Sequence, residues 1–343
     1  MKTLIRATNW IGDVAMSLPA LKALRASFPS DRISVLARPF VADLYRTRHE
    51  VNEVIVEDPK GEHRGSAGRA RLARELRERD FDRAILFPRS FGTALTLFRA
   101  GIPQRIGHRG EGRSVLLTQP VPAPPRREHQ VWKYLKLVEA AGGAVVSSPD
   151  ASWAVPDDLS RRARERLVEA GWNGEPFVAA HVASFAHRAK RWSVTRFAAT
   201  FDALFRRHRL GVVLLGSAAE KGMNAELIAA LHEARAVDLS GRSRIDEALG
   251  VVGLARLFVG NDSGLSHLAG AAGTPTVVVF GPTDPDATRP WDGPRSDGRP
   301  ARIRVVRRRT LCAPCLHTRC PLDHRCMTGV AVADVLRACD DVM

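Results

Sequence analysis

Short apolar runs bounded by turn residues alternate along the chain with longer segments whose apolar residues recur at helical spacing. In the first half, this pattern predicts strands at 3–8, 32–36, 54–56 and 83–87 and helices at about 68–79, 90–100 and 129–141. An apolar stripe made by Leu18, Leu21, Leu24 and Phe28 predicts a further helix directly after the first strand. Such alternation is typical of βαβ units, so the first half is predicted to be Rossmann-like.

The alternation restarts in the second half of the chain. Strands are predicted at 177–182, 212–215, 257–259 and 276–280, most of them followed by a helical pattern, and a last helix is predicted at 330–339. Between the halves, residues 145–159 are rich in serine, proline and aspartate, as linkers are. We therefore predict two facing α/β domains, 1–155 and 156–343, with a ligand-binding cleft between the carboxyl ends of their strands.

Composition agrees with two globular domains and adds a strong basic bias. The 343 residues exceed the size of one comfortable core. The amino-terminal sequence lacks the apolar stretch of a secretory signal and no run is long enough to span a membrane, so a cytoplasmic protein is expected. Lys and Arg number 52 against 37 Asp and Glu. This excess favours anionic partners: nucleic acid, a phosphorylated substrate or an anionic membrane surface.

The first loop that carries candidate chemistry is 9–13, between the first strand and its helix. Gly12 permits a tight turn, and Asp13 falls near the amino end of the helix. A carboxylate there either caps the helix or points into the cleft, where it could take a proton from an acceptor hydroxyl. Both roles stay open from the residues alone.

The second such loop, 260–267, lies between an apolar strand and a helix and has the character of a phosphate cradle. Gly264 lets the backbone approach a diphosphate, the helix terminus supplies N–H donors, and Ser263 adds a hydroxyl. His267 lies about one turn into the helix, where a histidine is either structural or a ligand.

Two further loops of the second half offer groups to a nucleotide. Ser184 and Lys190 follow the strand at 177–182 and present a hydroxyl and a point charge to phosphate oxygens. Gly216 follows the next strand, and Glu220 either accepts bonds from ribose hydroxyls or is an ordinary carboxylate of a first helical turn.

With these loops in view, the chain resembles glycosyltransferase family 9. The resemblance is carried by Trp10-Ile11-Gly12-Asp13-Val14, by 260–269 and by Gly281-Pro282-Thr283. Within the family it is similar to the ADP-heptose:lipopolysaccharide heptosyltransferases. Residues 88–91, 100–105 and 109–111 look most like the heptosyltransferase II group.

The resemblance implies a GT-B fold and an inverting transfer of heptose from ADP-L-glycero-D-manno-heptose to the heptosyl-Kdo-lipid A inner core. It also implies no cofactor, no catalytic metal and no nucleic-acid partner, and a cytoplasmic enzyme peripheral to the inner face of the inner membrane. It assigns catalysis to Asp13, as the base, and to Lys190, at the donor phosphates. It assigns the diphosphate and heptose loop to Asp262, Ser263 and Gly264. The loop containing Ser184, 183–187, departs from the family's hydroxyl-rich or Gly-rich forms.

The first domain is expected to bind the acceptor and the second the ADP-sugar. Anionic Kdo and lipid phosphates need cations near the cleft, and arginine binds such groups bidentately. The expected acceptor residues are Arg89, Arg105, Arg109 and Arg113.

A cysteine-rich segment at 312–326 stands apart from these loops. It contains Cys312, Cys315, Cys320 and Cys326, and its x2, x4 and x5 spacings match no standard zinc or ferredoxin pattern well. A structural metal and unligated thiols both stay open. Because the segment follows the last phosphate loop, it is expected to be structural and remote from the chemistry.

Two alternatives to heptose transfer remain. A GT-B enzyme using another sugar nucleotide, either another glycosyltransferase or an epimerase, would share the same loops. A basic nucleic-acid-binding protein would use the cysteine segment as a knuckle, but two complete α/β domains weigh against it.

Overall fold

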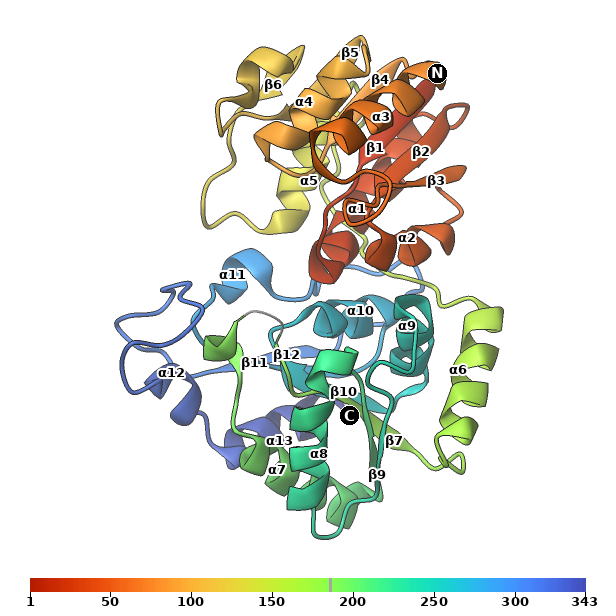
Figure 1. Ribbon diagram of the computed structural model, residues 1–343. Helices are drawn as coiled ribbons and strands as arrows, with labels where there is room; N and C mark the ends of the chain where they lie inside the picture. Colours follow the sequence, from red (N-terminus) through yellow and green to blue (C-terminus); the bar gives the residue numbers. More distant parts are fainter. Residues whose placement is uncertain (185–186) are drawn as a thin grey trace. The chain divides into compact units, whose positions relative to one another are not determined.

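The computed structural model describes residues 1–184 and 187–343, which form two compact units, Met1–Asp150 and Ala151–Met343 (Figure 1). Each unit has a six-stranded sheet whose neighbouring strands all run parallel, with helices connecting them. The predicted α/β class is therefore confirmed. No helix within the described ranges is long and apolar enough to span a lipid bilayer.

The sheet of unit 1 has the order β3-β2-β1-β4-β5-β6. Its strands are β1 (Lys2–Arg6), β2 (Arg32–Ala37), β3 (Glu53–Val56), β4 (Arg83–Leu86), β5 (Gln104–His108) and β6 (Gln119–Val121). Its helices are α1 (Ile11–Ser27), α2 (Pro39–Arg46), α3 (Gly65–Glu78), α4 (Phe91–Arg99), the 3-10 turn η1 (Arg113–Leu116) and α5 (Gln130–Ala140). The strand order reverses between β1 and β4, and ligands of open parallel sheets bind at such a switch point.

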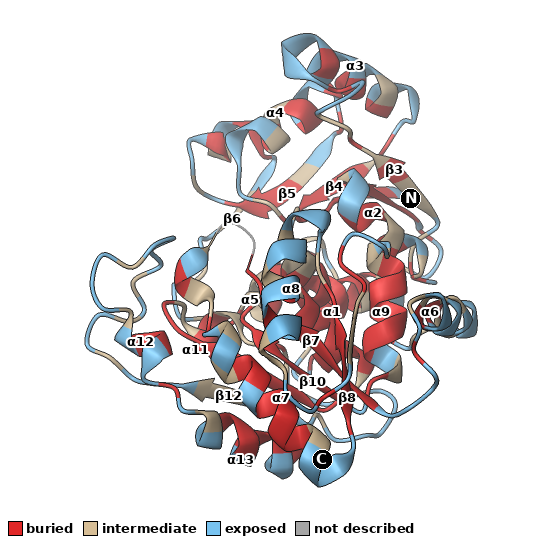
Figure 2. Ribbon diagram, turned by 60° about the horizontal axis from the view of Figure 1, so that its bottom comes forward, coloured by how far each residue is buried: buried red, intermediate tan, exposed pale blue. Residues whose placement is uncertain are grey.

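Burial explains why these segments fold as they do. Leu4 and Ile5 of β1 and Ile85 and Leu86 of β4 are buried, as expected for strands covered on both faces (Figure 2). Leu18, Leu21 and Leu24 of the predicted stripe are buried too, whereas Phe28 follows α1 and is half-buried. Helix α1 packs against α5. This packing brings the first turn of α1 beside α5, far away in sequence.

The sheet of unit 2 has the order β12-β11-β10-β7-β8-β9, with its switch point between β7 and β10. Its strands are β7 (Phe177–His181), β8 (Gly211–Leu214), β9 (Ala236–Asp238), β10 (Leu257–Asn261), β11 (Thr276–Phe280) and β12 (Ile303–Arg307). Its helical elements are α6 (Asp157–Glu169), η2 (Arg188–Lys190), α7 (Val194–His208), η3 (Ala218–Glu220), α8 (Lys221–Ala230), α9 (Ile245–Leu254), α10 (Gly264–Ala272), α11 (Pro285–Thr288), α12 (Arg325–Thr328) and α13 (Val332–Val342).

Several observed elements were absent from the sequence prediction: α2, β5, β6, β9 and β12. Of the strands among them, β6, β9 and β12 are edge strands, which have a neighbour on one side only, and β5 lies next to β6. β12 falls inside the basic run 302–309, whose arginines hide its apolar positions. In the run 64–79, by contrast, the arginines lie on the exposed face of α3, so there the basic residues form a solvated helix face.

Candidate active site

The predicted donor residues lie at the carboxyl edge of the unit 2 sheet. Ser184 follows β7, Gly216 follows β8, and Asp262 and Ser263 follow β10. Since β8, β7 and β10 are neighbours in a parallel sheet, their carboxyl ends meet at one edge. Gly281-Pro282-Thr283 joins them from β11, the next strand along.

A charged network centres on Asp262, which is buried. Its Oδ2 accepts a hydrogen bond from the Thr283 hydroxyl at 2.6 Å and forms an ion pair with the Lys190 ammonium at 2.7 Å. Lys190 ends η2 and its side chain is 19% exposed, so the ammonium keeps a path to solvent and to a ligand. Lys190 and Asp262, both predicted for the donor site, are thus in direct contact.

A second network joins three strand ends through His181, the last residue of β7. Its Nδ1 lies 2.9 Å from the Ser263 hydroxyl, and its Nε2 lies 3.5 Å from Oε2 of Glu220. The same Glu220 oxygen accepts bonds from the backbone N–H and the hydroxyl of Ser217. Burial alone would raise the pKa of Glu220, but the bonds and charge of His181 and the Ser217 donors bring it down to about 2.

His181 was missed by the sequence analysis because it completes an apolar strand and resembles a core residue. The signal that would have found it is its place at the carboxyl end of β7, beside the switch point. Its contacts hold Glu220 on the ligand edge of the sheet. The sequence alone had left two roles open for Glu220, a ligand of ribose hydroxyls or an ordinary carboxylate of a first helical turn.

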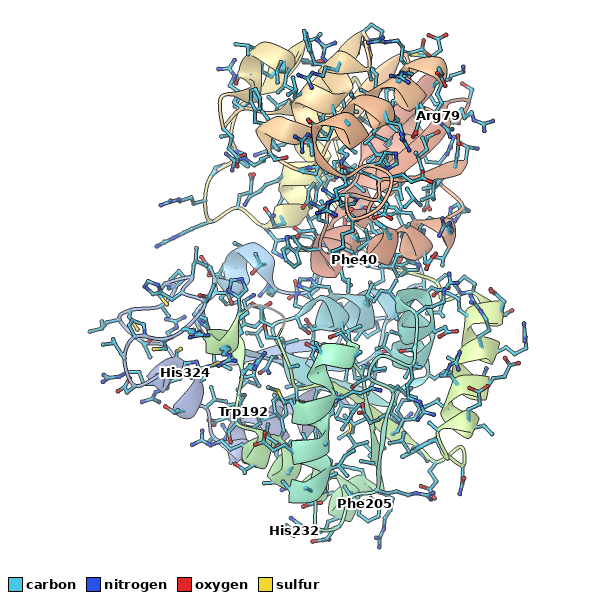
Figure 3. The ribbon with its side chains drawn as sticks, in the orientation of Figure 1. Phe40, Arg79, Trp192, Phe205, His232 and His324 are labelled. Carbon is cyan, nitrogen blue, oxygen red and sulfur yellow. The ribbon has the colours of Figure 1, made fainter. Side chains whose placement is uncertain are left out.

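The loop after β7 is anchored by Asn261. Its side-chain amide donates to the Val182 carbonyl at 2.6 Å and accepts from the Trp192 N–H at 3.0 Å. Trp192 itself is buried inside unit 2 (Figure 3). Ser184 is buried, and its carbonyl accepts from Arg191. Phe185 and Ala186, part of the atypical 183–187 loop, lie outside the described residues.

The amino end of α10 faces this edge. Ser263 is its N-cap in extended conformation and Gly264 its first residue. The cap uses no side-chain bond of its own to the helix, so the first N–H groups and the positive end of the dipole are available to an anion. His267 is buried in the first turn of the helix.

In unit 1, Asp13 lies in the first turn of α1, just after the carboxyl end of β1. Its Oδ1 accepts hydrogen bonds from the Tyr134 hydroxyl at 2.8 Å and from the Gln130 amide at 3.3 Å, both on α5. Burial, together with the Asp13 charge and hydrogen bond, raises the pKa of Tyr134 well above its ordinary value. Tyr134 therefore remains a donor at neutral pH and fixes the orientation of the carboxylate.

The four arginines predicted for acceptor binding do not form one group. Arg89 and Arg109 are exposed at the carboxyl ends of β4 and β5, and Arg89 donates to the Arg109 carbonyl at 3.5 Å. These two fit the expectation that cations lie on the ligand edge.

Arg105 lies at the other end of the sheet, which corrects the expectation. It is near the amino end of β5, and its guanidinium donates to the carbonyls of Leu116, Ile102 and Pro103 while covering the Phe98 ring. Its cation is committed to holding the α4–β5 connection, away from the ligand edge.

Arg113 is on the correct edge but fully buried. It donates to the carbonyls of His108 and Pro88, joining the ends of β5 and β4. Burial, reinforced by repulsion from Arg89, lowers the pKa of Arg113 to about 10. Its Nη2 has no hydrogen-bond partner within the residues that the structure describes. A side chain so placed joins the two strand ends.

A polar cavity of about 190 Å³ opens at the same edge of unit 1. It is lined by residues that include Arg38 after β2, Arg69 of α3, and Ser90 and Thr93 at the amino end of α4. Arg6, on its floor, is paired with Glu57 at 2.6 Å. Two cations, two hydroxyls and a helix amino end suit a phosphate or carboxylate. The sequence analysis did not include Arg38 or Arg69, although Arg38 directly follows a buried strand.

The two units thus hold complementary chemical groups. Unit 1 has an oriented carboxylate with exposed cations, which suits deprotonation of a hydroxyl on an anionic molecule. Unit 2 has a lysine, hydroxyls and a helix amino end at a switch point, which suits binding of a nucleoside diphosphate.

Comparison with known proteins agrees with this chemistry. Residues 69–325 match the model of glycosyltransferase family 9 (heptosyltransferase). The chain is 32% identical to lipopolysaccharide heptosyltransferase 2 of Escherichia coli K12 over 314 residues, covering 84% of this chain and 85% of that protein. It is 30% identical to lipooligosaccharide heptosyltransferase 2 of Haemophilus influenzae, covering 84% and 86%.

A solved structure gives the same result. The chain superposes on E. coli ADP-heptose lps heptosyltransferase II with a TM-score of 0.83 and 28% identity, covering 100% of this chain and 98% of that one. The predicted GT-B fold is confirmed by this match.

Proposed function

This chain belongs to glycosyltransferase family 9, and we propose that it transfers heptose from ADP-L-glycero-D-manno-heptose to the heptosyl-Kdo-lipid A inner core of lipopolysaccharide. The observation that carries the proposal is the edge of unit 2, where Lys190, Thr283 and the amino end of α10 surround Asp262. Cation, hydroxyl and helix terminus together are the groups that a nucleotide diphosphate requires.

The donor is proposed to bind unit 2. Its diphosphate binds the Lys190 ammonium and the N–H groups of Ser263 and Gly264. On binding, the ammonium replaces part of its contact with Asp262 by contacts with phosphate oxygens. Asp262 then accepts hydrogen bonds from donor hydroxyls. Glu220 stays ionised at neutral pH because its pKa is about 2, and with Gly216 beside it this carboxylate suits the ribose hydroxyls.

Asp13 is proposed to be the general base. It removes the proton from the attacking hydroxyl of the acceptor heptose while that oxygen forms a bond to the anomeric carbon of the donor. The bond from the anomeric carbon to the diphosphate breaks, and the departing electron pair leaves on ADP. Lys190 and the α10 terminus stabilise that negative charge. One direct displacement inverts the anomeric configuration.

The acceptor is proposed to bind unit 1 through its anionic groups. Arg89 and Arg109 offer exposed guanidinium groups. The cavity adds Arg69 and the hydroxyls of Ser90 and Thr93, together with Arg38, which is paired with Glu57 at 3.6 Å. Arg113 contributes by positioning the strand ends. Because the acceptor is a lipid, the enzyme is proposed to work in the cytoplasm, peripherally at the inner face of the inner membrane, aided by its positive charge.

The test is a transfer assay with purified protein, ADP-heptose and Kdo-lipid A that carries one heptose, followed by mass spectrometry. One added heptose per acceptor is expected. Matched controls are an acceptor without the first heptose, and UDP- and GDP-sugars as donors. Transfer from another nucleotide sugar in preference to ADP-heptose, or epimerisation of the donor without acceptor, would overturn the proposal.

A further inference from the structure

The segment between β12 and α12 has no regular secondary structure and little apolar burial. It runs from 308 to 324, and its three leucines, Leu311, Leu316 and Leu322, are all exposed. Irregular segments of this length in compact domains are uncommon. Where too little apolar surface is buried, a covalent or metal cross-link commonly supplies the missing stabilisation.

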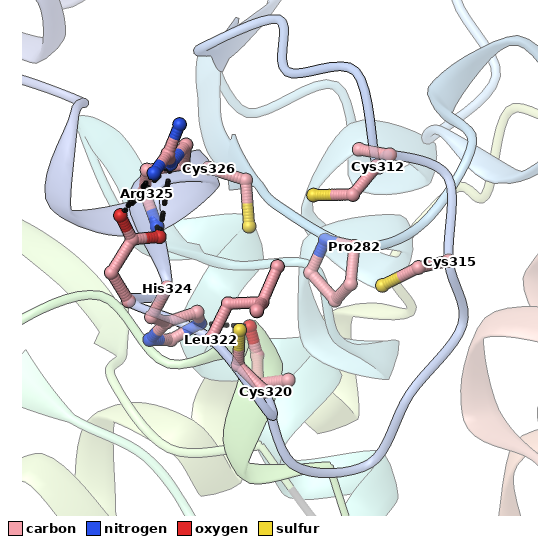
Figure 4. A pocket seen from close by; sticks show the side chains of 11 residues that line it. Pro282, Cys312, Cys315, Cys320, Leu322, His324, Arg325 and Cys326 are labelled. Atoms are coloured by element: carbon pink, nitrogen blue, oxygen red, sulfur yellow. Dashed lines mark hydrogen bonds and ion pairs between the residues drawn. The ribbon is translucent and has the colours of Figure 1, made fainter.

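Four cysteine thiols of this region line a single small cavity. They are Cys312, Cys315, Cys320 and Cys326. The cavity has a volume of about 20 Å³, close to that of one water molecule or ion. The rest of its lining comes from Ala189, Pro282, Ala313 and Leu322–Arg325. Figure 4 shows the four sulfurs directed inward, toward the space beside Pro282 and Leu322. The fifth cysteine, Cys339, is buried in α13 and does not line this cavity.

The thiols are also electrostatic neighbours. Burial raises the pKa of Cys326, and the charges of the other three cysteines raise it further. Thiols that converge on one point can lose their protons to a soft cation that binds between them. Tetrahedral sites of four thiolates are typical of zinc and of iron–sulfur centres. The arginines that flank the cysteines at 307–309 and 319 would balance the net negative charge of a filled tetrathiolate site, whereas Arg325 is paired with Asp323.

We propose that the four cysteines of the 312–326 segment bind one thiophilic metal ion and that this site braces the loops of the donor edge. His324 is not needed as a ligand, since its Nε2 lies 2.6 Å from the Ala189 carbonyl. Within residues 1–184 and 187–343, no three His, Cys, Asp or Glu side chains already form a metal-binding group. The sulfurs therefore move inward on binding, which the exposed and irregular backbone permits.

The bracing follows from backbone contacts of the same segment. The N–H groups of Cys315 and Leu316 both donate to the Pro282 carbonyl at 3.0 Å, one residue before Thr283. Ala189, one residue before Lys190, donates to the Thr318 carbonyl at 3.0 Å. The sequence analysis expected this segment to be remote from the chemistry. The structure corrects that expectation, because the segment contacts two of the predicted donor loops.

The experiment measures metal in the full chain, purified under reducing conditions from cells grown with zinc and iron. Elemental analysis is expected to find about one zinc or iron per chain. Cys315→Ser and Cys320→Ser should each lose at least about 90% of that metal and melt at a lower temperature. Cys339→Ser, which alters a buried thiol outside the cavity, should keep it. Titrating the wild-type thiols with an organomercurial should release the metal, and the absorbance of a metal-binding dye should report the released ion. This measurement does not depend on the folding of any variant.

Bracing is tested by calorimetry of ADP binding before and after metal release, with affinity expected to fall about three- to tenfold. This consequence rests on the proposed function, whereas metal content does not, so the two fail separately. Less than about 0.1 metal ion per chain, with four freely titratable thiols or with disulfides in the mass spectrum, would overturn the metal site. Bound metal with unchanged ADP affinity would overturn the bracing alone.

Discussion

The candidate sites of the two units differ in how their charges are balanced. In unit 2, Lys190 is paired with Asp262, and Glu220 is held by His181 and Ser217, so the site is neutralised by its own residues. In unit 1, the exposed guanidinium groups of Arg89 and Arg109 donate to backbone carbonyls. Carbonyl dipoles orient a guanidinium without cancelling its charge.

This difference indicates how each candidate site binds its ligand. A self-neutralised site is preorganised, and a ligand binds it by exchanging one partner for another. A site rich in uncancelled positive charge attracts an anionic ligand from a distance, and its affinity depends on salt. We therefore expect substitutions in unit 2 to disturb both binding and turnover, and substitutions of exposed arginines in unit 1 to disturb acceptor binding alone.

The largest effect on turnover is expected for substitution of Asp13. This residue differs from the arginines of unit 1 because its proposed role is that of the general base. Asp13→Asn keeps the size of the side chain and an oxygen that can accept from Tyr134, but it cannot take a proton. Turnover should fall by about 100-fold or more, the usual scale of a lost general base. ADP affinity and Tm should stay near their wild-type values. If the variant turns over normally, Asp13 serves only the helix terminus and the base lies elsewhere.

Lys190→Ala is expected to come next. It removes the proposed phosphate-binding cation and also leaves the buried Asp262 carboxylate without its ammonium partner. ADP affinity and kcat/KM should both fall by about 30-fold, or about 2 kcal/mol, the scale of a hydrogen bond to a charged group. Adding Asp262→Asn should recover part of the ADP affinity. A double variant no better than Lys190→Ala would contradict the exchange of partners described above.

Tyr134→Phe should have a smaller effect on turnover. The change deletes the hydroxyl that donates to Asp13 and preserves the ring that packs against Phe87. Loss of one hydrogen bond to a carboxylate, about 1.5 kcal/mol, corresponds to about a tenfold decrease in kcat. It should also raise the pKa of the catalytic base, so the acid limb of the pH–rate profile moves to higher pH. A decrease in kcat with an unmoved acid limb would assign Tyr134 to packing instead.

Arg109→Ala should change acceptor binding by less again. An exposed charge pair contributes up to about 1 kcal/mol, so the acceptor KM should rise about fivefold while the donor KM stays constant. Arg105→Ala is the matched control on the same strand, and it should leave both constants unchanged. The difference between the two variants should shrink at high salt. Equal effects of both substitutions would remove the distinction between the two edges of the sheet.

The smallest effect concerns the self-neutralised network of unit 2. Glu220 has a pKa of about 2, below its ordinary value of 4.5. A depressed carboxyl pKa contributes stability that is present above pH about 4.5 and is lost as the pH falls toward 2. Relative to the wild type, Glu220→Gln should lower Tm by about 2–4 °C at pH 7, a gap that narrows below pH about 4.5 and closes near pH 2. A gap that is constant across pH would mean that packing, not charge, accounts for the effect.

The central strands and long helices could be predicted from the sequence because their apolar periodicity is a local property. The strands at 32–37, 83–86 and 276–280 and the stripe of α1 follow from short-range pattern alone. The edge strands β6, β9 and β12 could not, because pairing with a neighbour forms them and their own residues carry little signal.

For the candidate site, the sequence by itself determined which loops hold the candidate residues. Strand-to-helix junctions with glycine and polar residues appear directly in the chain, and they pointed to Asp13, Lys190 and Asp262. Only the tertiary structure decided which side chains meet: that His181 reaches Glu220, that Tyr134 reaches Asp13, that Arg105 belongs to the opposite edge and that Arg113 is buried. The reason is physical, since hydrogen bonds and burial act between residues far apart in the sequence, 121 positions in the case of Asp13 and Tyr134, and no local pattern encodes such contacts.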